Sequence, residues 1–374
     1  MTHRRRRLTP TGAMAAVIAV VSLAPSSVAG QAAAKTAPTR STYTTPRTPW
    51  GHPDLQGVWN NAVSTPLERP LALAGKTTWT DQELADYTKR ARASRENRDR
   101  RDQKPGTVTD VGRAYNALWF PVPGDPIRRT SLVIDPPDGR VPEVTPQAKQ
   151  RFAAYAKSIG RFGGSGSLDG RDDIEDGTEG GVDGRGTRGD NPEDRSLSER
   201  CVHKSYVPRL PGGYNNHLQI VQSPGYVVIE MEQSHDARLV PLDGRPHLPA
   251  SIRHWMGDSR GRWEGNTLVV DVTNFTDKSP FRGSLENLHL VERFTRVDAN
   301  TISYEVTVDD PTTFTKPWKA EFPWTKLDAL VGGVDHVSVP RMFEYACQEG
   351  NYGLEVQLRG SRAEEKAKGI AARR

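Results

Sequence analysis

The chain has 374 residues, enough for two average domains or one large one. Hydrophobic residues make up 35% of it, and its 34 glycines and 28 prolines indicate short elements joined by many turns, which excludes a helical bundle or a coiled coil. A mean hydropathy of −0.66 and a single apolar stretch near the N-terminus exclude a protein with several membrane spans.

Residues 1–29 have the pattern of a signal peptide. Four consecutive arginines precede an apolar stretch at 13–24, and Ser27-Val28-Ala29 places small side chains before a cleavage site. We therefore predict a protein that is exported, secreted or periplasmic, and that keeps no transmembrane segment after cleavage. The paired arginines also resemble a twin-arginine signal. Residues 30–48 are small and polar, which predicts a linker.

The formal net charge of +5 does not indicate a nucleic-acid-binding protein. The four arginines of the signal peptide account for most of this excess. Further basic residues lie in 359–374, which we predict to be a disordered tail. We therefore expect a small-molecule ligand rather than nucleic acid as the partner, and a monomeric protein.

Residues 49–160 are predicted to be an N-terminal segment that packs on a β-domain. Glycines and prolines divide the string from Pro49 to Trp59 into turns. Four apolar side chains of this string are expected to plug onto the surface of the β-domain: Trp50, Leu55, Val58 and Trp59.

Two helices are predicted within this segment. Residues 80–83, Thr-Asp-Gln-Glu, form a capping box that opens a helix to about Arg101. Proline is tolerated at the first helical position, so Pro146 after Thr145 opens a second helix, to about Ser158.

Residues 161–197 are rich in glycine and aspartate and contain few apolar side chains, which predicts a mobile loop. The string from Gly163 to Asp169 faintly resembles a calcium-binding repeat. A calcium-binding solenoid needs stacked copies, and the chain has no second copy. We therefore interpret this segment as an acidic loop.

Residues 198–358 consist of short apolar runs between turn residues, which predicts a β-domain. Within 301–309 the apolar and polar side chains alternate strictly, and Gly265-Asn266 fits the tight turn of a hairpin. Strands are expected at 217–223, 226–233, 236–242, 263–264, 267–271, 287–297, 301–309, 316–323 and 341–348. The fold class is therefore mainly β: an antiparallel meander closing into a lipocalin- or calycin-like barrel or sandwich, with a helical and loop-rich N-terminal part.

The chain contains two cysteines, Cys201 and Cys347. In an oxidising compartment such a pair forms a disulfide. We therefore predict a bond that ties the start of the β-domain to its last strand. Two buried free thiols are the alternative.

The candidate catalytic residues lie where ionisable side chains are dense, between residues 230 and 264: Glu232, His235, Arg238 and Asp258. An imidazole near a carboxylate is the minimal arrangement for proton transfer, and an arginine can bind a carboxylate or an oxyanion. Glu230 and Glu232 share one face of a strand. If that face lines an interior they form an acid/base pair; if it faces water they are ordinary surface residues.

The candidate substrate-binding residues are aromatic or polar side chains that could line one cleft: His247, Trp255, Trp263, Trp318 and Glu349. The same tryptophans could equally belong to an ordinary β-core. Nothing in the spacing of His235, His247 and His254 brings them together, so we expect no metal site. Asp243 and Arg245 are expected to pair within a turn that delivers His247.

Several motifs resemble those of a large group of exported bacterial proteins of unassigned function. They occur at Pro49–Trp59, Arg129–Arg140, Leu242–His247, Gly261–Asp271 and Glu349–Asn351. The resemblance covers about 50–160 and 198–358, and it implies export and a shared fold. It implies no chemistry, because the group has no settled activity.

We therefore expect an exported protein with a pocket for a small organic molecule in its β-domain. Acid/base chemistry of a lyase, isomerase or hydrolase fits the supply of His, Glu and Arg, and no motif for an organic cofactor is seen. The alternatives are a non-catalytic, lipocalin-like ligand-binding protein and an envelope interaction protein that uses the Trp-rich N-terminal segment.

Overall fold

The computed structural model describes the following residues: 43–99, 125–158, 191–192, 197, 200–203, 207–212, 215–278, 281–330, 342–350, 352–367 and 369. The predicted signal peptide, most of the predicted linker and nearly all of the Gly/Asp-rich segment lie outside these residues. Within the described part of the chain, no helix has the length and apolar character needed to cross a membrane.

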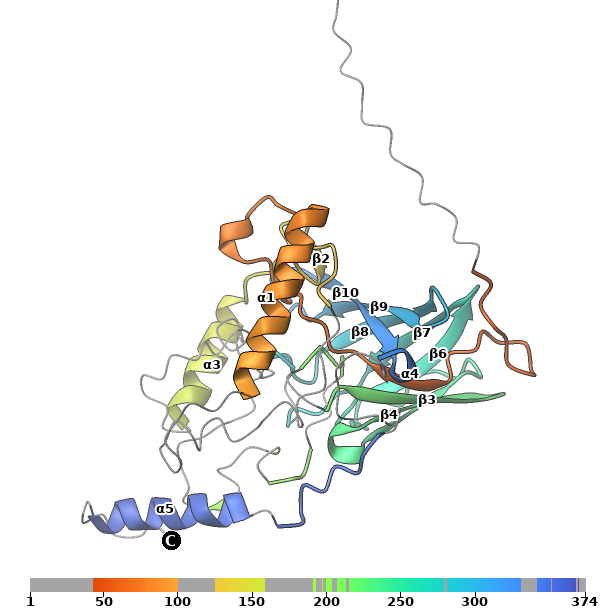
Figure 1. Ribbon diagram of the computed structural model, residues 1–374. Helices are drawn as coiled ribbons and strands as arrows, with labels where there is room; N and C mark the ends of the chain where they lie inside the picture. The colour runs from red at the N-terminus through yellow and green to blue at the C-terminus, as the bar shows by residue number, and fades with distance from the viewer. Residues whose placement is uncertain are drawn as a thin grey trace, which may run out of the picture. The chain divides into compact units, whose positions relative to one another are not determined.

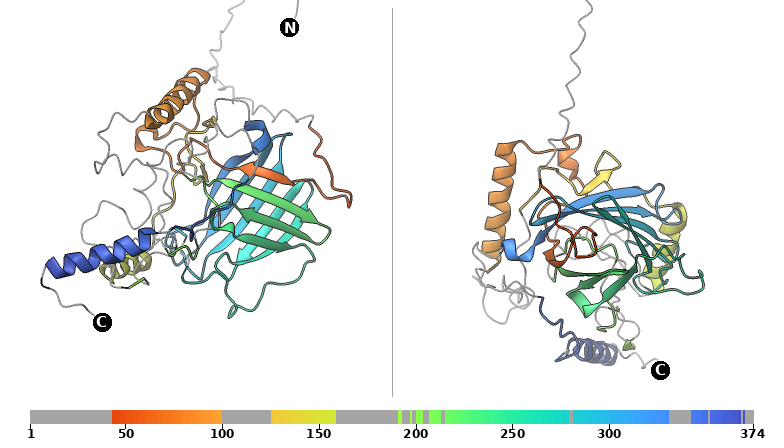
Figure 2. Two further views of the ribbon diagram at one scale, coloured as in Figure 1. Left: turned by 60° about the horizontal axis from the view of Figure 1, so that its bottom comes forward. Right: turned by 90° about the vertical axis from the view of Figure 1, so that its right-hand side faces the viewer.

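Ten strands among the described residues form one antiparallel sheet that curls almost into a barrel (Figures 1 and 2). The sheet order is β5-β4-β3-β1-β10-β9-β8-β7-β6, and β2 pairs with β10. The strands are β1 (Gly57–Asn60), β2 (Val133–Asp135), β3 (His217–Ser223), β4 (Tyr226–Met231), β5 (Ala237–Pro241), β6 (Asp258–Glu264), β7 (Thr267–Thr273), β8 (His289–Arg296), β9 (Thr301–Asp309) and β10 (Trp318–Lys326). The predicted mainly β, barrel-like fold is confirmed.

Period-two alternation places alternate side chains of each strand inside the barrel. On β9 the inward side chains are all fully buried: Ile302, Tyr304, Val306 and Val308. Gly265 makes the tight turn between β6 and β7 with a φ of 62°, in the left-handed region that favours glycine. The sequence therefore predicted strand β9 and the β6–β7 hairpin correctly.

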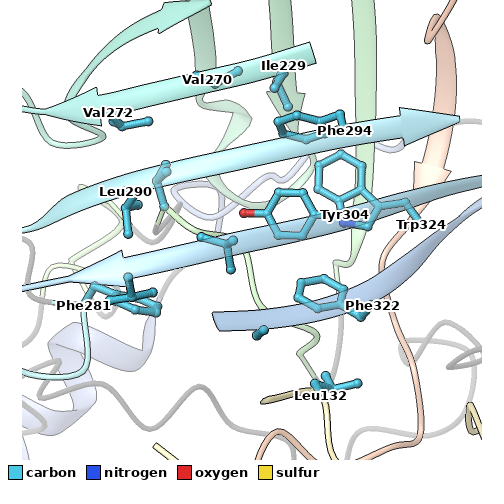
Figure 3. Close-up of a cluster of buried hydrophobic side chains, with 14 of the residues drawn as sticks. Leu132, Ile229, Val270, Val272, Phe281, Leu290, Phe294, Tyr304, Phe322 and Trp324 are labelled. Atoms are coloured by element: carbon cyan, nitrogen blue, oxygen red, sulfur yellow. The ribbon is translucent and has the colours of Figure 1, made fainter. Parts of the chain in front are cut away.

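An aromatic cluster fills part of the barrel interior (Figure 3). The ring of Tyr304 lies 5.0 Å from each of the rings of Phe294, Phe322 and Trp324, measured between centroids. These side chains come from the three adjacent strands β8, β9 and β10, so the cluster fixes the packing of that side of the barrel.

Strand β1 differs from the sequence-based expectation, because it is part of the sheet rather than a plug on its surface. It pairs with β3 on one side and β10 on the other. Leu55 and Trp59 are fully buried, and the Trp59 Nε1–H donates to the Leu55 carbonyl at 2.9 Å. The string from Pro49 to Trp59 therefore bridges the two halves of the barrel, which are distant in sequence.

The two predicted helices are observed as α1 (Asp81–Asp99) and α3 (Pro146–Ser158). The capping box forms, because the Thr80 N–H donates to Glu83 and the Glu83 N–H donates to Thr80 Oγ1. Hydrogen bonds from Lys76 and Thr80 lower the pKa of Glu83 to about 2. Thr145 caps α3 by accepting the Ala148 N–H at 3.1 Å. The shorter helical elements are η1 (Leu71–Leu73), η3 (Gln233–His235) and α4 (Leu327–Leu330).

The C-terminal region also differs from expectation. No strand forms in 342–350, where one was expected at 341–348, because backbone N–H groups there bond to side chains instead of a neighbouring strand. Helix α5 (Tyr352–Ala367) continues regular structure into the range that we expected to be a disordered tail. Residues 43–48, expected to end a linker, contact the barrel: Thr45 bonds to the Arg296 carbonyl and Arg47 to Asn266.

The barrel closes between β5 and β6 by side-chain contact rather than by a hydrogen-bonded ladder. A Cβ atom on Gly261 of β6 would lie 2.6 Å from Val240 Cγ1 and 2.7 Å from Leu242 Cδ2. Only glycine allows this approach, so Gly261 marks the seam of the barrel.

The two ends of the barrel differ in their connections. At one end, the turn end, tight turns at 224–225, 265–266 and 297–300 join the strands. At the other, the loop end, the connections are longer: 232–236, 274–288 and 310–317. The loop end therefore offers more irregular backbone, which is where functional side chains concentrate.

Candidate functional site

The structure does not bring the four predicted catalytic residues into contact with one another. Glu232 pairs with a histidine beside the β4–β5 connection, and His235 lies exposed in that connection. Arg238 points into the barrel, whereas Asp258 lies at the start of β6 with its side chain on the outside. These residues belong to three separate groups, which are described in turn.

The first group is a chain of hydrogen bonds on the outer face of β6, β7 and β8, here called the histidine–carboxylate array: His247, Asp258, Asp271 and His289. His247 Nδ1 lies 3.0 Å from Asp258 Oδ2, and His247 Nε2 lies 2.9 Å from Asp271 Oδ1. His289 Nε2 lies 3.1 Å from Asp271 Oδ2. Two imidazoles therefore share the carboxylate of Asp271.

Strand alternation places this array outside the barrel. On β7 the buried Val270 and Val272 point inward, so Asp271 between them points outward. His289 starts β8 on the outer face, two residues before Val291, the register partner of Asp271. Asp258 occupies the outer face of β6, where Arg260 Nη1 binds it at 2.6 Å.

The loop between β5 and β6 delivers His247 to the array. The Leu248 N–H donates to Asp258 Oδ2 at 2.9 Å, which fixes the backbone beside His247. The expected ion pair between Asp243 and Arg245 forms at the start of this loop. Hydrogen bonds from Arg245 lower the pKa of Asp243. That this turn positions His247 stays a prediction.

Mutual hydrogen bonding shifts the pKa values within the array. The bond to Asp271 raises the pKa of His289, and the same bond lowers the pKa of Asp271. Burial raises the pKa of Asp258, but the Leu248 N–H, His247 and Arg260 outweigh that effect and hold it below its ordinary value. Both carboxylates are therefore ionised at neutral pH.

The two histidines of the array have different chemical capacities. Both ring nitrogens of His247 lie against carboxylate oxygens, so neither is left for a solute. His289 uses Nε2 for Asp271, and its Nδ1 has no partner among the described residues. The His289 side chain is 41% exposed, so it can exchange a proton with a solute. In the described part of the chain, no three His, Cys, Asp or Glu side chains are arranged to hold a metal ion.

The second group is a charge cluster inside the barrel: Arg238, Glu292 and Tyr304. The Arg238 guanidinium binds the Glu292 carboxylate through two bonds of 3.1 and 2.6 Å, and the Tyr304 hydroxyl donates to Glu292 at 2.7 Å. The Arg238 side chain is 4% exposed and that of Glu292 is 2% exposed. Burial, followed by the nearby Glu292 charge, raises the pKa of Tyr304 well above its ordinary value.

Strand register explains how the barrel accommodates this interior charge cluster. One row across the strands carries small side chains on both sides of Glu292: Ala320, Val306, Val270 and Gly261. The next row toward the turn end is large: Phe322, Tyr304, Phe294, Leu268 and Trp263. The row of small residues leaves the room that the Arg238 guanidinium occupies.

The third group surrounds the β4–β5 connection. Glu232 is buried and its Oε2 lies 3.0 Å from His217 Nδ1. The exposed His235 accepts the Tyr345 N–H on Nε2 at 2.6 Å. Ser234 and His235 both adopt left-handed backbone, with φ values of 67° and 53°. Glu230 lies on the outer face of β4, so it does not form an interior acid/base pair with Glu232.

The predicted binding residues are dispersed. His247 belongs to the array, and the ring of Trp255 lies 5.5 Å from that of His203. Trp263 packs beside His52, at 5.4 Å between ring centroids. Trp318 is fully buried between Phe281 and Phe314, so it belongs to the core, and Glu349 lies in an exposed turn.

Sequence reasoning missed several residues of these groups: Asp271, His289, Glu292, Tyr304 and His217. A usable signal was present for Asp271, because it is the one charged residue of β7, and for Glu292, because it shares its face of β8 with Leu290 and Phe294. The sequence could not predict their partners. His247 binds Asp271 and Arg238 binds Glu292, and each of these partners comes from an element that is distant in sequence.

Comparisons with protein-family models, with curated proteins and with solved structures give no match. The resemblance to a group of exported bacterial proteins therefore stays a prediction.

Proposed function

We propose that this protein is an exported enzyme that transfers a proton to or from a small organic molecule at the histidine–carboxylate array. His289 is the proton carrier. The observation that carries the proposal is the His289–Asp271 pair, in which a carboxylate orients a half-exposed imidazole whose second ring nitrogen makes no hydrogen bond to another described residue.

The other members of the array act through Asp271. His247 binds Oδ1 of Asp271, and Asp258 binds the other ring nitrogen of His247. Arg260 binds Asp258 in turn. This chain fixes the orientation of the Asp271 carboxylate and hence that of the His289 ring. His247, Asp258 and Asp271 are therefore positioning residues, and His289 is the group that meets the substrate.

The packing of the barrel interior supports a site on the outer face. The rings of Phe294, Tyr304, Phe322 and Trp324 contact one another inside the barrel (Figure 3). The Arg238 and Glu292 charges of the interior cluster pair with each other through two hydrogen bonds. A lipocalin-like ligand would compete with these side chains for the same space, whereas His289 of the array is already close to half-exposed.

Two observations support export. Residues 1–29 have the pattern of a signal peptide, and the sulfurs of Cys201 and Cys347 lie at disulfide-bonding distance. An extracytoplasmic substrate is therefore part of the proposal.

A generic proton-transfer probe tests the proposal without knowledge of the natural substrate. The ring of 5-nitrobenzisoxazole opens with a change in absorbance when a base removes its carbon-bound proton. We expect the protein to accelerate this reaction over buffer, and His289→Gln to lower the rate by at least about a hundredfold, the lower end of what a general base contributes. The rate should rise with pH as His289 loses its proton.

His254→Gln is the matched control, because the His254 side chain is exposed and lies outside the array. It should leave the rate unchanged. Equal rates for the unmodified protein, His289→Gln and His254→Gln would overturn the assignment of His289 as proton carrier.

A further inference from the structure

Residues 342–347, here called the strap, cross the β4–β5 connection in an irregular conformation. The Phe343 N–H donates to Glu232 Oε1 at 3.4 Å, and the Tyr345 N–H donates to His235 Nε2 at 2.6 Å. The rings of Tyr345 and His235 meet edge to face at 6.3 Å. The side chains of the β4–β5 connection thus bind the backbone N–H groups of every second strap residue. Proteins bind extended peptide segments through this alternate pattern of backbone hydrogen bonds.

The C-terminal end of the strap is held by the cysteine pair. Cys347 ends the strap, and its Cα lies 5.7 Å from that of Cys201, within the range of a disulfide. The Gln348 side chain also donates to the Cys201 carbonyl at 3.2 Å. The strap takes part in no strand pairing among the described residues. The strap is therefore attached by a covalent link and by hydrogen bonds to side chains. The hydrogen bonds to side chains open more readily than a strand ladder does.

A buried histidine–carboxylate pair lies where the strap attaches. The Glu232 carboxylate that accepts the Phe343 N–H also pairs with His217, and both side chains are largely buried. The connection beside them holds two consecutive residues, Ser234 and His235, in left-handed backbone. Such strain in residues other than glycine is maintained only where the surrounding structure requires it, and it is frequent beside functional groups.

We propose that the strap is a disulfide-latched lid, which excludes solutes from the Glu232–His217 pair until the Cys201–Cys347 bond opens. A dithiol reductant opens the latch by two thiol–disulfide exchanges. The S–S bond gains two electrons and two protons to give the Cys201 and Cys347 thiols, and the dithiol becomes its cyclic disulfide. The lid does not depend on the proton-transfer function proposed for His289.

Amide hydrogen exchange tests the latch. In the oxidised protein, the Phe343 and Tyr345 amides should exchange slowly, because both are hydrogen-bonded. Reduction with dithiothreitol, or the double variant Cys201→Ser/Cys347→Ser, should accelerate their exchange by at least about tenfold. The amides of β9 should remain protected, because the barrel does not depend on the strap for strand pairing.

Chemical modification tests whether the pair becomes accessible. Diethyl pyrocarbonate should modify His217 slowly in the oxidised protein and severalfold faster after reduction, as read by mass spectrometry. His235→Ala should accelerate Tyr345 amide exchange with the disulfide intact, whereas His254→Ala, a substitution of an exposed histidine that makes no side-chain hydrogen bond to the strap, should not.

Two results would overturn the lid. One is an unchanged rate of Phe343 and Tyr345 exchange and of His217 modification after reduction. The other is simultaneous loss of protection in β9, which would make the disulfide a staple of the whole fold rather than a latch.

Discussion

Glu292 and His289 both belong to strand β8, but Glu292 points into the barrel and His289 lies on its outer face. Glu292 is sealed from solvent and bound by Arg238 and Tyr304, whereas His289 is half-exposed and bound only through one ring nitrogen. The interior charge cluster and the histidine–carboxylate array thus use similar chemistry in different environments. Access to water, rather than residue type, therefore separates a structural charge from one that can exchange protons.

The interior charge cluster also has a geometric role that the array lacks. Arg238 belongs to β5 and Glu292 to β8, so their ion pair spans the interior near the seam between β5 and β6. No backbone ladder joins β5 to β6. The buried pair therefore helps hold the edge strand β5 against the rest of the barrel.

The largest expected effect comes from breaking this pair. Glu292→Ala leaves the Arg238 charge buried without its partner, which destabilises a fold by about 3–5 kcal/mol. Urea unfolding measures the loss. The double variant Arg238→Met/Glu292→Leu removes both charges and should recover most of it. A loss for Glu292→Ala below about 1 kcal/mol would show that water reaches the interior and that the contrast with the array is false.

The seam itself offers the second test. Gly261→Ala places a Cβ within 2.6 Å of Val240 Cγ1, and such overpacking costs about 1–3 kcal/mol. Gly225→Ala is the matched control, because a Cβ there meets nothing within 4 Å. Equal stability of the two variants in thermal unfolding would mean that β5 and β6 separate freely.

A smaller effect on the free energy of unfolding is expected when the pH changes the charge of His289 in the array. Because Asp271 raises the pKa of His289 in the folded state, this pair stabilises the protein fully below the unfolded pKa of about 6.5. The contribution is lost as the pH rises through the raised folded pKa. Solvent screens the half-exposed pair, so it contributes less than about 1 kcal/mol.

NMR titration of the His289 ring measures this shift directly. Asp271→Asn should lower the midpoint toward the ordinary value for histidine, because the carboxylate charge is gone. His254 in the same spectrum provides an internal reference. If the midpoint of the His289 titration is the same in Asp271→Asn, Asp271 does not interact with His289 as the array requires.

The smallest effect is expected at the Asp243–Arg245 pair. The sequence predicted that this pair holds the turn that delivers His247, but both side chains are close to half-exposed in the structure. Solvent screening makes such surface pairs weak. We expect a melting temperature within error of the unmodified protein, and a fall as large as that of Gly261→Ala would contradict the assignment of this turn to the surface.

The part of the fold that was predictable rests on local rules. The alternation of Ile302, Tyr304, Val306 and Val308 identified β9, and the capping box at Thr80 and Glu83 identified the start of α1. These signals are readable because the interacting groups lie within a few residues of one another. The strand expected at 341–348 failed for the opposite reason, since a strand needs a partner and the strap bonds to side chains.

The candidate site was only partly predictable. His247 and Asp258 were singled out from the density of charge, and both belong to the array. His289 and Asp271 were not, because their role depends on the register of β7 and β8 and on the path of the loop that brings in His247. Arg238 was singled out, but its partner Glu292 lies on a strand across the barrel.

By itself, the sequence determined the mainly β fold, two helices with their caps, and the pairing of the only two cysteines. These follow from periodicity, local hydrogen bonding and the presence of a single possible partner. Only the tertiary structure decided which face of each strand encloses the interior. Alternation defines two faces but not their surroundings, so closure of the barrel assigned Glu292 to the interior and His289 to solvent.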